Sequence, residues 1–157
     1  MSSHVRLRSD SDLGICVQIL ADVHTGDGYP VNWPADPAGW LTPDLLIGAW
    51  VAELDGKVAG HGALTRGADP LRCEVSRLYV APAARGHRLG QRLMERLMEA
   101  ARGQGLRPVL DVVATDTAAT ALYERLGWVR TTTVEERWGP DQVVTVHHYE
   151  APAGPVG

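Results

Sequence analysis

A change of hydrophobic period between residues 73 and 101 constrains the fold more than any other feature of this sequence. Residues 73–80 have the β-branched and aromatic content of a strand, and Pro82 ends that strand because proline has no N–H group for the hydrogen-bond ladder. From residue 89 onward, apolar side chains recur at the spacing of one helix face: Leu89, Leu93, Leu97 and Ala101, with Met94 and Met98 beside them. The chain therefore joins a strand to an amphipathic helix through one short turn.

That turn carries two glycines, Gly86 and Gly90, together with the basic side chains Arg85, His87 and Arg88. The start of a helix leaves about four amide N–H groups without intrahelical partners and carries roughly half a positive charge. Glycines allow a ligand to approach the backbone closely. The turn therefore predicts a pyrophosphate site, and the alternative is an ordinary helix start with solvated basic side chains.

The stretch resembles the acetyl-CoA signature of the GNAT superfamily of N-acetyltransferases, Arg/Gln-x-x-Gly-x-Gly/Ala. Arg85 opens the signature and Gly90 closes it, whereas Arg88 stands where the middle glycine usually is. Other phosphate-binding loops fit less well. No Gly-Lys-Ser/Thr follows the glycines, as a nucleoside-triphosphate loop requires, and a dinucleotide site would need an acidic residue about 20 positions further on.

A second segment, residues 115–128, resembles the second GNAT motif, Asn-x-x-Ala-x-x-Leu-Tyr-x-x-Leu-Gly-Phe. Asp116 replaces the asparagine and suits a helix N-cap, Gly127 suits the left-handed position that ends a helix, and Trp128 replaces the phenylalanine. Five positions fall in register: Ala119, Leu122, Tyr123, Leu126 and Gly127. The alternative is a helix in which Tyr123 is only a core residue.

The remaining sequence predicts strands and helices around these two motifs. Strands are expected at residues 5–8, 48–54, 58–65, 108–114, 129–138 and 142–150, and a helix runs from a cap at Ser9 or Ser11 to about residue 23. Leu13, Val17 and Leu20 are expected on its buried side. Together with the resemblance, this order implies an α+β (α/β-like) single-domain GNAT-type fold over residues 1–157, with a mixed, mostly antiparallel central sheet flanked by helices. Residues 151–157 are expected to form a flexible tail.

Composition limits the partners and the compartment. The 157 residues suit one domain, and 45% hydrophobic and 22% charged residues are typical of a globular protein. A net charge of −4 argues against a nucleic-acid partner or an anionic membrane surface. No segment is apolar enough to span a membrane, so we expect a cytoplasmic protein. Cys16 and Cys73 lack metal-ligand spacing and are expected to be reduced, buried thiols.

The resemblance implies that the protein transfers the acetyl group of acetyl-CoA to an amine by direct attack, without a metal. It implies that residues 78–80 pair with the pantetheine arm and that Tyr123 protonates the departing sulfur. The residues that the resemblance implies for cofactor binding are Leu78, Tyr79, Val80, Arg85, Gly86, His87, Arg88, Leu89, Gly90, Gln91 and Asp116. A catalytically silent acyl-CoA-binding sensor or regulatory module of the same fold is the alternative function.

The general base stays open among three residues. An amine with an ordinary pKa of about 10.4 must lose a proton before it attacks a thioester. Glu74 shares strand parity with Leu78 and Val80, so we expect it on the face of the cofactor arm, with a surface carboxylate as the alternative. Asp27 and His61 are the other candidates.

The acceptor is expected to be a small-molecule amine or a peptide amine. Asp27, Tyr29, Trp33 and Trp40 belong to a segment rich in glycine and proline, and they could meet a cationic amine by charge and cation–π contact. The alternative is a surface loop held in place by its aromatic side chains. Glycines on both sides of His61 predict close packing against one face of that strand. A homodimer through the terminal strands is a further hypothesis.

Overall fold

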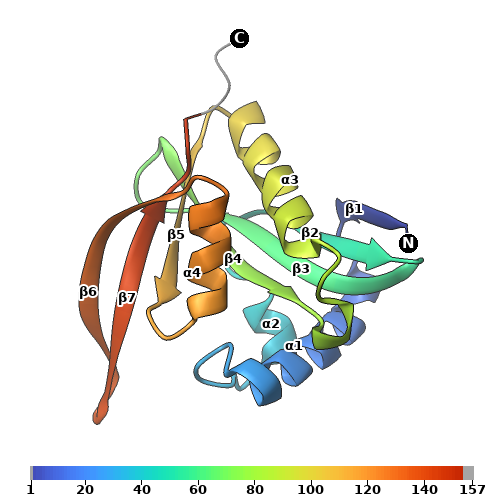
Figure 1. The fold of residues 1–157 in the computed structure, drawn as a ribbon, viewed down its shortest axis with the longest axis horizontal. Helices are drawn as coiled ribbons and strands as arrows, with labels where there is room; N and C mark the ends of the chain where they lie inside the picture. The colour runs from blue at the N-terminus through green and yellow to red at the C-terminus, as the bar shows by residue number, and fades with distance from the viewer. Residues whose placement is uncertain (1, 154–157) are drawn as a thin grey trace.

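A seven-stranded sheet runs through the computed structural model, which describes residues 2–153 (Figure 1). Its strands are β1 (Ser3–Leu7), β2 (Leu46–Leu54), β3 (Lys57–Arg66), β4 (Arg72–Val80), β5 (Arg107–Val113), β6 (Val129–Gly139) and β7 (Gln142–Glu150). They lie in the order β1-β2-β3-β4-β5-β7-β6. Every neighbouring pair is antiparallel except β4 and β5, which are parallel. The expected mixed, mostly antiparallel sheet is confirmed.

Helices cover both faces of this sheet. Their bounds are α1 (Leu13–Asp27), α2 (Pro37–Trp40), α3 (Leu89–Gly103) and α4 (Thr117–Arg125). The first two lie on one face and the last two on the other (Figure 1). A Cβ atom at Gly60 would lie 3.1 Å from Leu93 Cδ1, and one at Gly62 would lie 3.0 Å from Leu97 Cδ1. The two glycines therefore let α3 pack closely on β3, as the sequence predicted.

Helix α1 buries the side that was expected. Its fully buried side chains are Cys16, Ile19, Leu20 and Val23, and the partly buried Leu13 and Val17 pack against the same cluster. The capping serine is Ser9, and a 3-10 turn at Asp10–Asp12 lies between this cap and the α-helix. The predicted burial of Cys16 is confirmed, and the Tyr79 hydroxyl donates a hydrogen bond to the Cys16 carbonyl oxygen (2.9 Å).

A β-bulge interrupts β4 where it pairs with β3. His61 lies opposite Tyr79 and Ala63 lies opposite Ser76, so two steps along β3 match three steps along β4. Arg77, within the extra step, has a φ of 51°, in the left-handed region. An extra residue reverses the alternation of side chains beyond it.

The bulge overturns the parity argument for Glu74. Val75 packs in the core with α3, so alternation places Glu74 on the α1 face of the sheet. Beyond the bulge, Leu78 Cδ1 lies only 3.2 Å from a Cβ placed on Gly62, on the α3 face. Glu74 and Leu78 therefore lie on opposite faces, because one added residue separates them.

Strands β4 and β5 pair over only three residues and then separate. The paired residues are Arg72 with Arg107, Cys73 with Pro108 and Glu74 with Val109. Beyond Glu74, β4 is hydrogen-bonded to β3 alone among the described strands. The second half of β4 therefore presents a free backbone edge toward β5.

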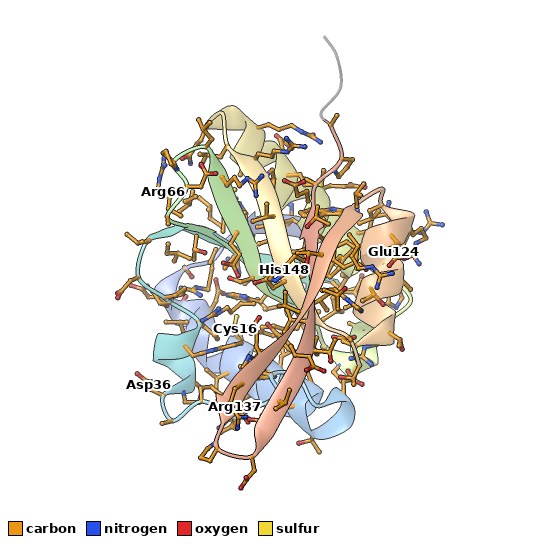
Figure 2. All side chains as sticks on the ribbon, turned by 90° about the vertical axis from the view of Figure 1, so that its left-hand side faces the viewer. Cys16, Asp36, Arg66, Glu124, Arg137 and His148 are labelled. Atoms are coloured by element: carbon orange, nitrogen blue, oxygen red, sulfur yellow. The ribbon has the colours of Figure 1, made fainter. Side chains whose placement is uncertain are left out.

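The chain closes with the β6–β7 hairpin, which projects past the other strands (Figure 1). Figure 2 views this hairpin and shows Arg137 near its tip. The side-chain amides of Asn32 and Gln142 exchange two hydrogen bonds of 3.2 and 3.3 Å, which tie the hairpin to the loop after α1. Strand β6 forms one edge of the sheet. The homodimer hypothesis for the terminal strands stays a prediction.

Ala151, which was expected to begin a flexible tail, belongs to the core. It is buried, and its N–H donates to the Pro108 carbonyl oxygen (3.1 Å). Residues 154–157 of that tail lie outside the described part of the chain.

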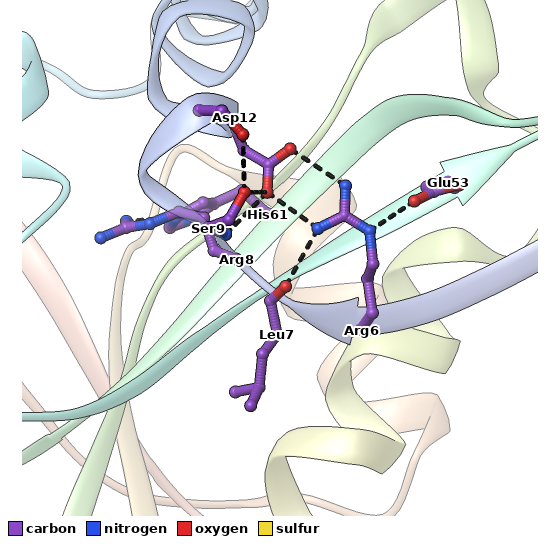
Figure 3. Close-up of polar contacts among 8 residues, drawn as sticks. Arg6, Leu7, Arg8, Ser9, Asp12, Glu53 and His61 are labelled. Atoms are coloured by element: carbon purple, nitrogen blue, oxygen red, sulfur yellow. Dashed lines mark hydrogen bonds and ion pairs between the residues drawn. The ribbon is translucent and has the colours of Figure 1, made fainter.

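An arginine at the start of the chain joins three elements (Figure 3). Arg6 on β1 donates to both carboxylate oxygens of Asp12 (2.8 and 3.0 Å) and to Glu53 on β2. Asp12 also accepts the Ser9 N–H (2.7 Å) and is 7% exposed. The hydrogen bonds from Arg6 hold the pKa of Asp12 well below its usual range.

We expect Asp12→Asn to lower the free energy of unfolding at pH 7 by about 2 kcal/mol, since it removes charge-assisted bonds to Arg6. Because the folded-state pKa is depressed, the contribution of Asp12 is present above about pH 4 and is lost as the pH falls further. Urea unfolding of parent and variant at pH 7 and pH 3 measures this. The exposed Asp10→Asn is the matched control, expected within about 0.5 kcal/mol of the parent. Equal stability of Asp12→Asn and parent at pH 7 would contradict the argument.

Candidate active site

Three adjoining cavities form one groove beside the free edge of β4. The turn cavity, about 320 Å³, lies at the start of α3. The central cavity, about 400 Å³, lies between β4 and α4, and the aromatic cavity, about 350 Å³, lies between β4, β5 and the loop after α1. The turn and central cavities share Val80, Arg85, Gly90 and Leu122. The central and aromatic cavities share Tyr29, Leu78, Asp116, Ala119 and Tyr123.

The turn cavity has the features of an anion site. The amide groups of residues 86–91 have no acceptor among the described residues, and the first backbone bond of α3 runs from the Arg92 N–H to the Arg88 carbonyl (3.0 Å). A Cβ atom at Gly86 would meet nothing within 4 Å, so the backbone there is open. Unpaired amides at a helix start attract a phosphate or another anion.

Arg88 takes the backbone conformation that explains why glycine is usual at its position. It is the N-cap of α3 with φ 60° and ψ 26°, in the left-handed region. Glycine adopts this conformation freely, whereas another residue loses roughly 1–2 kcal/mol. The turn thus keeps its geometry without the glycine.

Arg85 and Asp27 form an ion pair at the central cavity, which both residues line. Hydrogen bonds from Arg85 lower the pKa of Asp27 below its usual range. Asp27 does not line the aromatic cavity. It therefore fits poorly as a base or as a contact for an amine there, and its carboxylate instead orients Arg85 beside the turn.

Tyr123 lies where the central and aromatic cavities meet. Asp116 caps its helix by accepting the Ala119 N–H (3.1 Å), and Gly127 ends the segment with a φ of 90°, both as predicted. Tyr123 is 8% exposed, and its hydroxyl makes no hydrogen bond to any described residue. Burial raises the pKa of Tyr123 well above its ordinary value, so the hydroxyl carries its proton at neutral pH.

The aromatic cavity is lined mainly by apolar side chains from several elements. Tyr29 and Trp40 line it as expected, but Trp33 does not, because its ring packs on His24 with centroids 5.3 Å apart. The face of Trp40 is already covered by the Arg77 guanidinium, 4.2 Å from the ring centroid. The predicted cation–π site for an amine at Trp40 is therefore occupied by a side chain of the protein.

One carboxylate lines this cavity on β5, and a histidine and a second carboxylate lie on the neighbouring strands. Asp111 lines the cavity and pairs with His148 of the neighbouring strand β7. Burial, followed by the charge of Asp111, raises the pKa of Glu74 above its usual range. Glu74 lies on the same face of the sheet but is not among the lining residues. A carboxylate whose pKa is raised is a stronger proton acceptor than an ordinary one.

His61 is held as a structural residue. It is fully buried, and Nδ1 lies 2.9 Å from the Arg77 carbonyl oxygen while Nε2 lies 3.0 Å from Arg8 Nη1. A carbonyl only accepts and a guanidinium only donates, so the proton is on Nδ1 and Nε2 accepts. His61 and Glu74 line none of the three cavities. The ring nitrogens of His61 and the carboxylate of Asp27 are engaged with arginines or a carbonyl group, whereas the Glu74 carboxyl has no hydrogen-bond or ion-pair partner among the described residues.

The other predicted cofactor residues divide between the cavities. Arg85, Gly86, Arg88, Leu89, Gly90 and Gln91 line the turn cavity, and Leu78, Tyr79, Val80 and Asp116 line the central one. His87 lines neither cavity. Sequence reasoning missed Arg77, Asp111 and Trp138, which line the aromatic cavity, because strands far apart in the chain bring them together.

Comparison with known proteins identifies the family. The sequence matches the acetyltransferase (GNAT) family over residues 18–128, which includes both motifs. This chain belongs to the GNAT family. It is an acyltransferase of that family, and the alternative of a catalytically silent sensor gains no support from these comparisons.

Relatives and solved structures agree with this assignment. The GNAT chain is 34% identical over 117 residues to IAA acetyltransferase of Azospirillum brasilense, covering 71% of this chain and 75% of that one. Its fold resembles the ribosomal-protein-S18-alanine N-acetyltransferase of Escherichia coli (TM-score 0.77, 20% identity, 99% and 97% of the two chains). It also resembles yncA of Salmonella typhimurium, solved with its cofactor acetyl-CoA (TM-score 0.74, 21% identity, 99% and 98%).

Within residues 2–153, no cluster of three or more His, Cys, Asp or Glu side chains is arranged to hold a metal ion. In the same part of the chain, every helix is too short or too polar to cross a membrane.

The buried position of His61 predicts that its ring does not titrate near neutral pH. Burial lowers its pKa to about 4, so the folded protein keeps the ring neutral while the unfolded chain protonates near pH 6.5. We expect the His61 ring signals in NMR spectra to stay constant between pH 8 and 5.5, with the Nδ1–H tautomer. The ring signal that is absent from the spectrum of the His61→Gln variant is assigned to His61. A midpoint near 6.5 would restore His61 as a candidate base.

Proposed function

We propose that this GNAT enzyme is an N-acetyltransferase that transfers the acetyl group of acetyl-CoA to the amine of a small-molecule or peptide acceptor by direct attack. The observation that carries the proposal is the position of Tyr123 at the junction of two cavities, one reaching the open helix start and the other walled by aromatic side chains. One cavity can hold the acyl donor and the other the acceptor.

The groove offers a contact for each part of the donor from the pyrophosphate to the acetyl group. The unpaired amides of residues 86–91, with Arg85 and Arg88, would bind the pyrophosphate. The free edge of β4 at residues 78–80 would pair with the pantetheine arm, and Asp116 lies beside it. Acetyl-CoA would supply an activated acetyl group as a thioester. A backbone N–H of this edge would donate to the acetyl carbonyl oxygen, where negative charge develops.

Two side chains would move the protons of the reaction. Glu74, whose pKa is raised by burial, would accept the proton of the acceptor amine, directly or through a water molecule. Asp27 and His61 are engaged with Arg85 and with Arg8 and Arg77, which favours Glu74 over them. Tyr123 would donate the proton of its Oη to the departing sulfur, because the hydroxyl is protonated and has no partner among the described residues.

The helix-start assignment predicts that Gly90→Val weakens acetyl-CoA binding by at least about tenfold. A Cβ at residue 90 would lie 3.3 Å from Leu122 Cδ2, and the added methyl groups would project where the turn and central cavities meet. Calorimetric titration with acetyl-CoA measures the loss. In the parent, acetyl-CoA at 100 times its dissociation constant should raise the free energy of unfolding by about 2.7 kcal/mol.

The matched control is Gly103→Val in the last turn of the same helix, where a Cβ atom meets nothing within 4 Å. It changes the backbone in the same way, so we expect it to bind acetyl-CoA as the parent does. Parent-like binding by Gly90→Val would show that the helix start is not the pyrophosphate site. Absence of any stabilisation of the parent by acetyl-CoA would refute the proposed function.

Tyr123→Phe keeps nearly all the volume of the side chain and removes the hydroxyl group that would donate the proton. If Tyr123 is the general acid, turnover should fall by roughly 100- to 10,000-fold with little change in acetyl-CoA affinity. Turnover is measured as the release of CoA, which a thiol reagent detects, with the slowest accepted amine as the acceptor. Tyr149→Phe is the control and should keep the turnover of the parent. The Tyr149 hydroxyl donates a hydrogen bond to Glu124, and Tyr149 lines none of the three cavities. Turnover of Tyr123→Phe within about twofold of the parent would remove Tyr123 from the mechanism.

A further inference from the structure

The aromatic cavity contains one fixed positive charge that the proposed reaction does not use. Arg77 is the single lysine or arginine among its lining residues in the described chain. Its neighbours on the cavity wall are mainly apolar or aromatic, among them Tyr29, Trp40, Val113 and Trp138. A cation in such a wall is costly to desolvate, so its orientation and its partners decide what the cavity can bind.

The guanidinium of Arg77 is held in place by two contacts. It stacks on Trp40, with Cζ 4.2 Å from the ring centroid, and its Nε donates to the Trp40 carbonyl oxygen (3.1 Å). The backbone is fixed as well, because the Arg77 carbonyl at the bulge accepts the Nδ1–H of His61 (2.9 Å), which is itself bonded to Arg8. These contacts orient the side chain in advance, so less conformational entropy is lost when a ligand binds.

The two terminal nitrogens of Arg77 remain available. Within residues 2–153, neither Nη atom has a hydrogen-bond acceptor, and no carboxylate oxygen lies within 4.0 Å of the guanidinium. The carboxylates that line the cavity have other roles, since Asp111 pairs with His148 and Asp116 caps α4. Glu74 is near enough for Arg77 to lower its pKa in part, but burial and Asp111 outweigh that effect.

We propose that Arg77 binds a carboxylate of the acceptor, and that the acceptor is a free amino acid with an apolar side chain. This inference rests on the proposed N-acetyltransferase function. The planar Nη pair suits a carboxylate in a bidentate geometry, and the aromatic wall suits an apolar side chain. Arg77 and Tyr123 both line the aromatic cavity, so a ligand whose carboxylate is bound to Arg77 occupies the same cavity as the Tyr123 side chain. A cavity of about 350 Å³ is of the size that encloses a small molecule.

A polycationic acceptor fits this cavity less well. The ring face of Trp40 is covered by Arg77, which would repel an ammonium group. Of the two carboxylates that line the cavity, Asp111 is paired with His148 and Asp116 caps α4. Charge and geometry therefore favour an acceptor with one amine and one carboxylate over a polyamine.

The experiment compares matched acceptors that differ in the carboxylate alone. CoA release by the full-length parent is measured with L-phenylalanine, L-phenylalaninamide and 2-phenylethylamine, and with L-leucine, L-leucinamide and 3-methylbutylamine. We expect kcat/KM for each acid to exceed that for its amide and its amine by at least about tenfold, as loss of a charge-assisted bond predicts. Spermidine serves as the polycationic acceptor.

Variants of residue 77 connect the preference to the guanidinium. Arg77→Gln should bring the acid-to-amide ratio to within about threefold of unity, mainly through the KM of the acid, and Arg77→Lys should retain an intermediate ratio because the charge remains without the fork. Glutamine and lysine meet the same backbone constraint as arginine at φ 51°. Arg66→Gln, an exposed arginine on β3, is the matched control and should keep the ratio of the parent. Stabilisation by acetyl-CoA checks that each variant is folded.

The outcomes separate this inference from the function on which it rests. Equal turnover of acid and amide by the parent, an unchanged ratio in Arg77→Gln, or turnover of spermidine alone would overturn the inference and leave the acetyltransferase intact. The inference is also overturned if the parent binds acetyl-CoA but turns over neither phenylalanine nor leucine, and if neither amino acid stabilises the protein in the presence of CoA. A parent that neither binds acetyl-CoA nor acetylates any amine would overturn the proposed function and the inference together.

Discussion

The separation of β4 from β5 is the constraint on which the rest of this structure depends. The two strands pair over three residues, and β4 then continues on β3 alone. Unpaired backbone N–H and C=O groups in a protein interior must find a partner, and water or a ligand supplies it where the sheet does not. The bulge at Arg77 adds to the separation by turning the strand and reversing its faces. The separation of the strands thus leaves the groove open, and the bulge sets the order of side chains along it.

Helix α3 depends on the same strand. It packs on the bare face of β3 at Gly60 and Gly62, and this close approach fixes the helix start beyond the end of β4. The open amides of the turn, the free edge of β4 and Tyr123 of α4 therefore lie along one continuous groove. The groove therefore depends on both α3 and α4, which cover the same face of the sheet.

Pairing between charged groups decides which charges the groove presents. Asp27 is bound to Arg85, and Asp111 is bound to His148, so two acidic side chains near the cavities already have partners. His61 is buried as a neutral ring and supports the bulge instead of taking part in proton transfer. Glu74, with its raised pKa, and Arg77, with two free nitrogens, are left as the groups with capacity for chemistry or recognition.

The sequence by itself determined the family, the strand–turn–helix with its glycines, the capped helix of Tyr123 and most of the strands. These features depend on local period, capping and backbone freedom, which neighbouring residues specify. Only the tertiary structure decided the face of Glu74, the partner of Asp27, the burial of His61 and the exposure of Arg77 to the aromatic cavity. A bulge depends on the pairing of two strands, and an ion pair depends on groups as far apart in the chain as residues 27 and 85. Such contacts between distant residues leave no period or spacing in the sequence, because the fold alone brings them together.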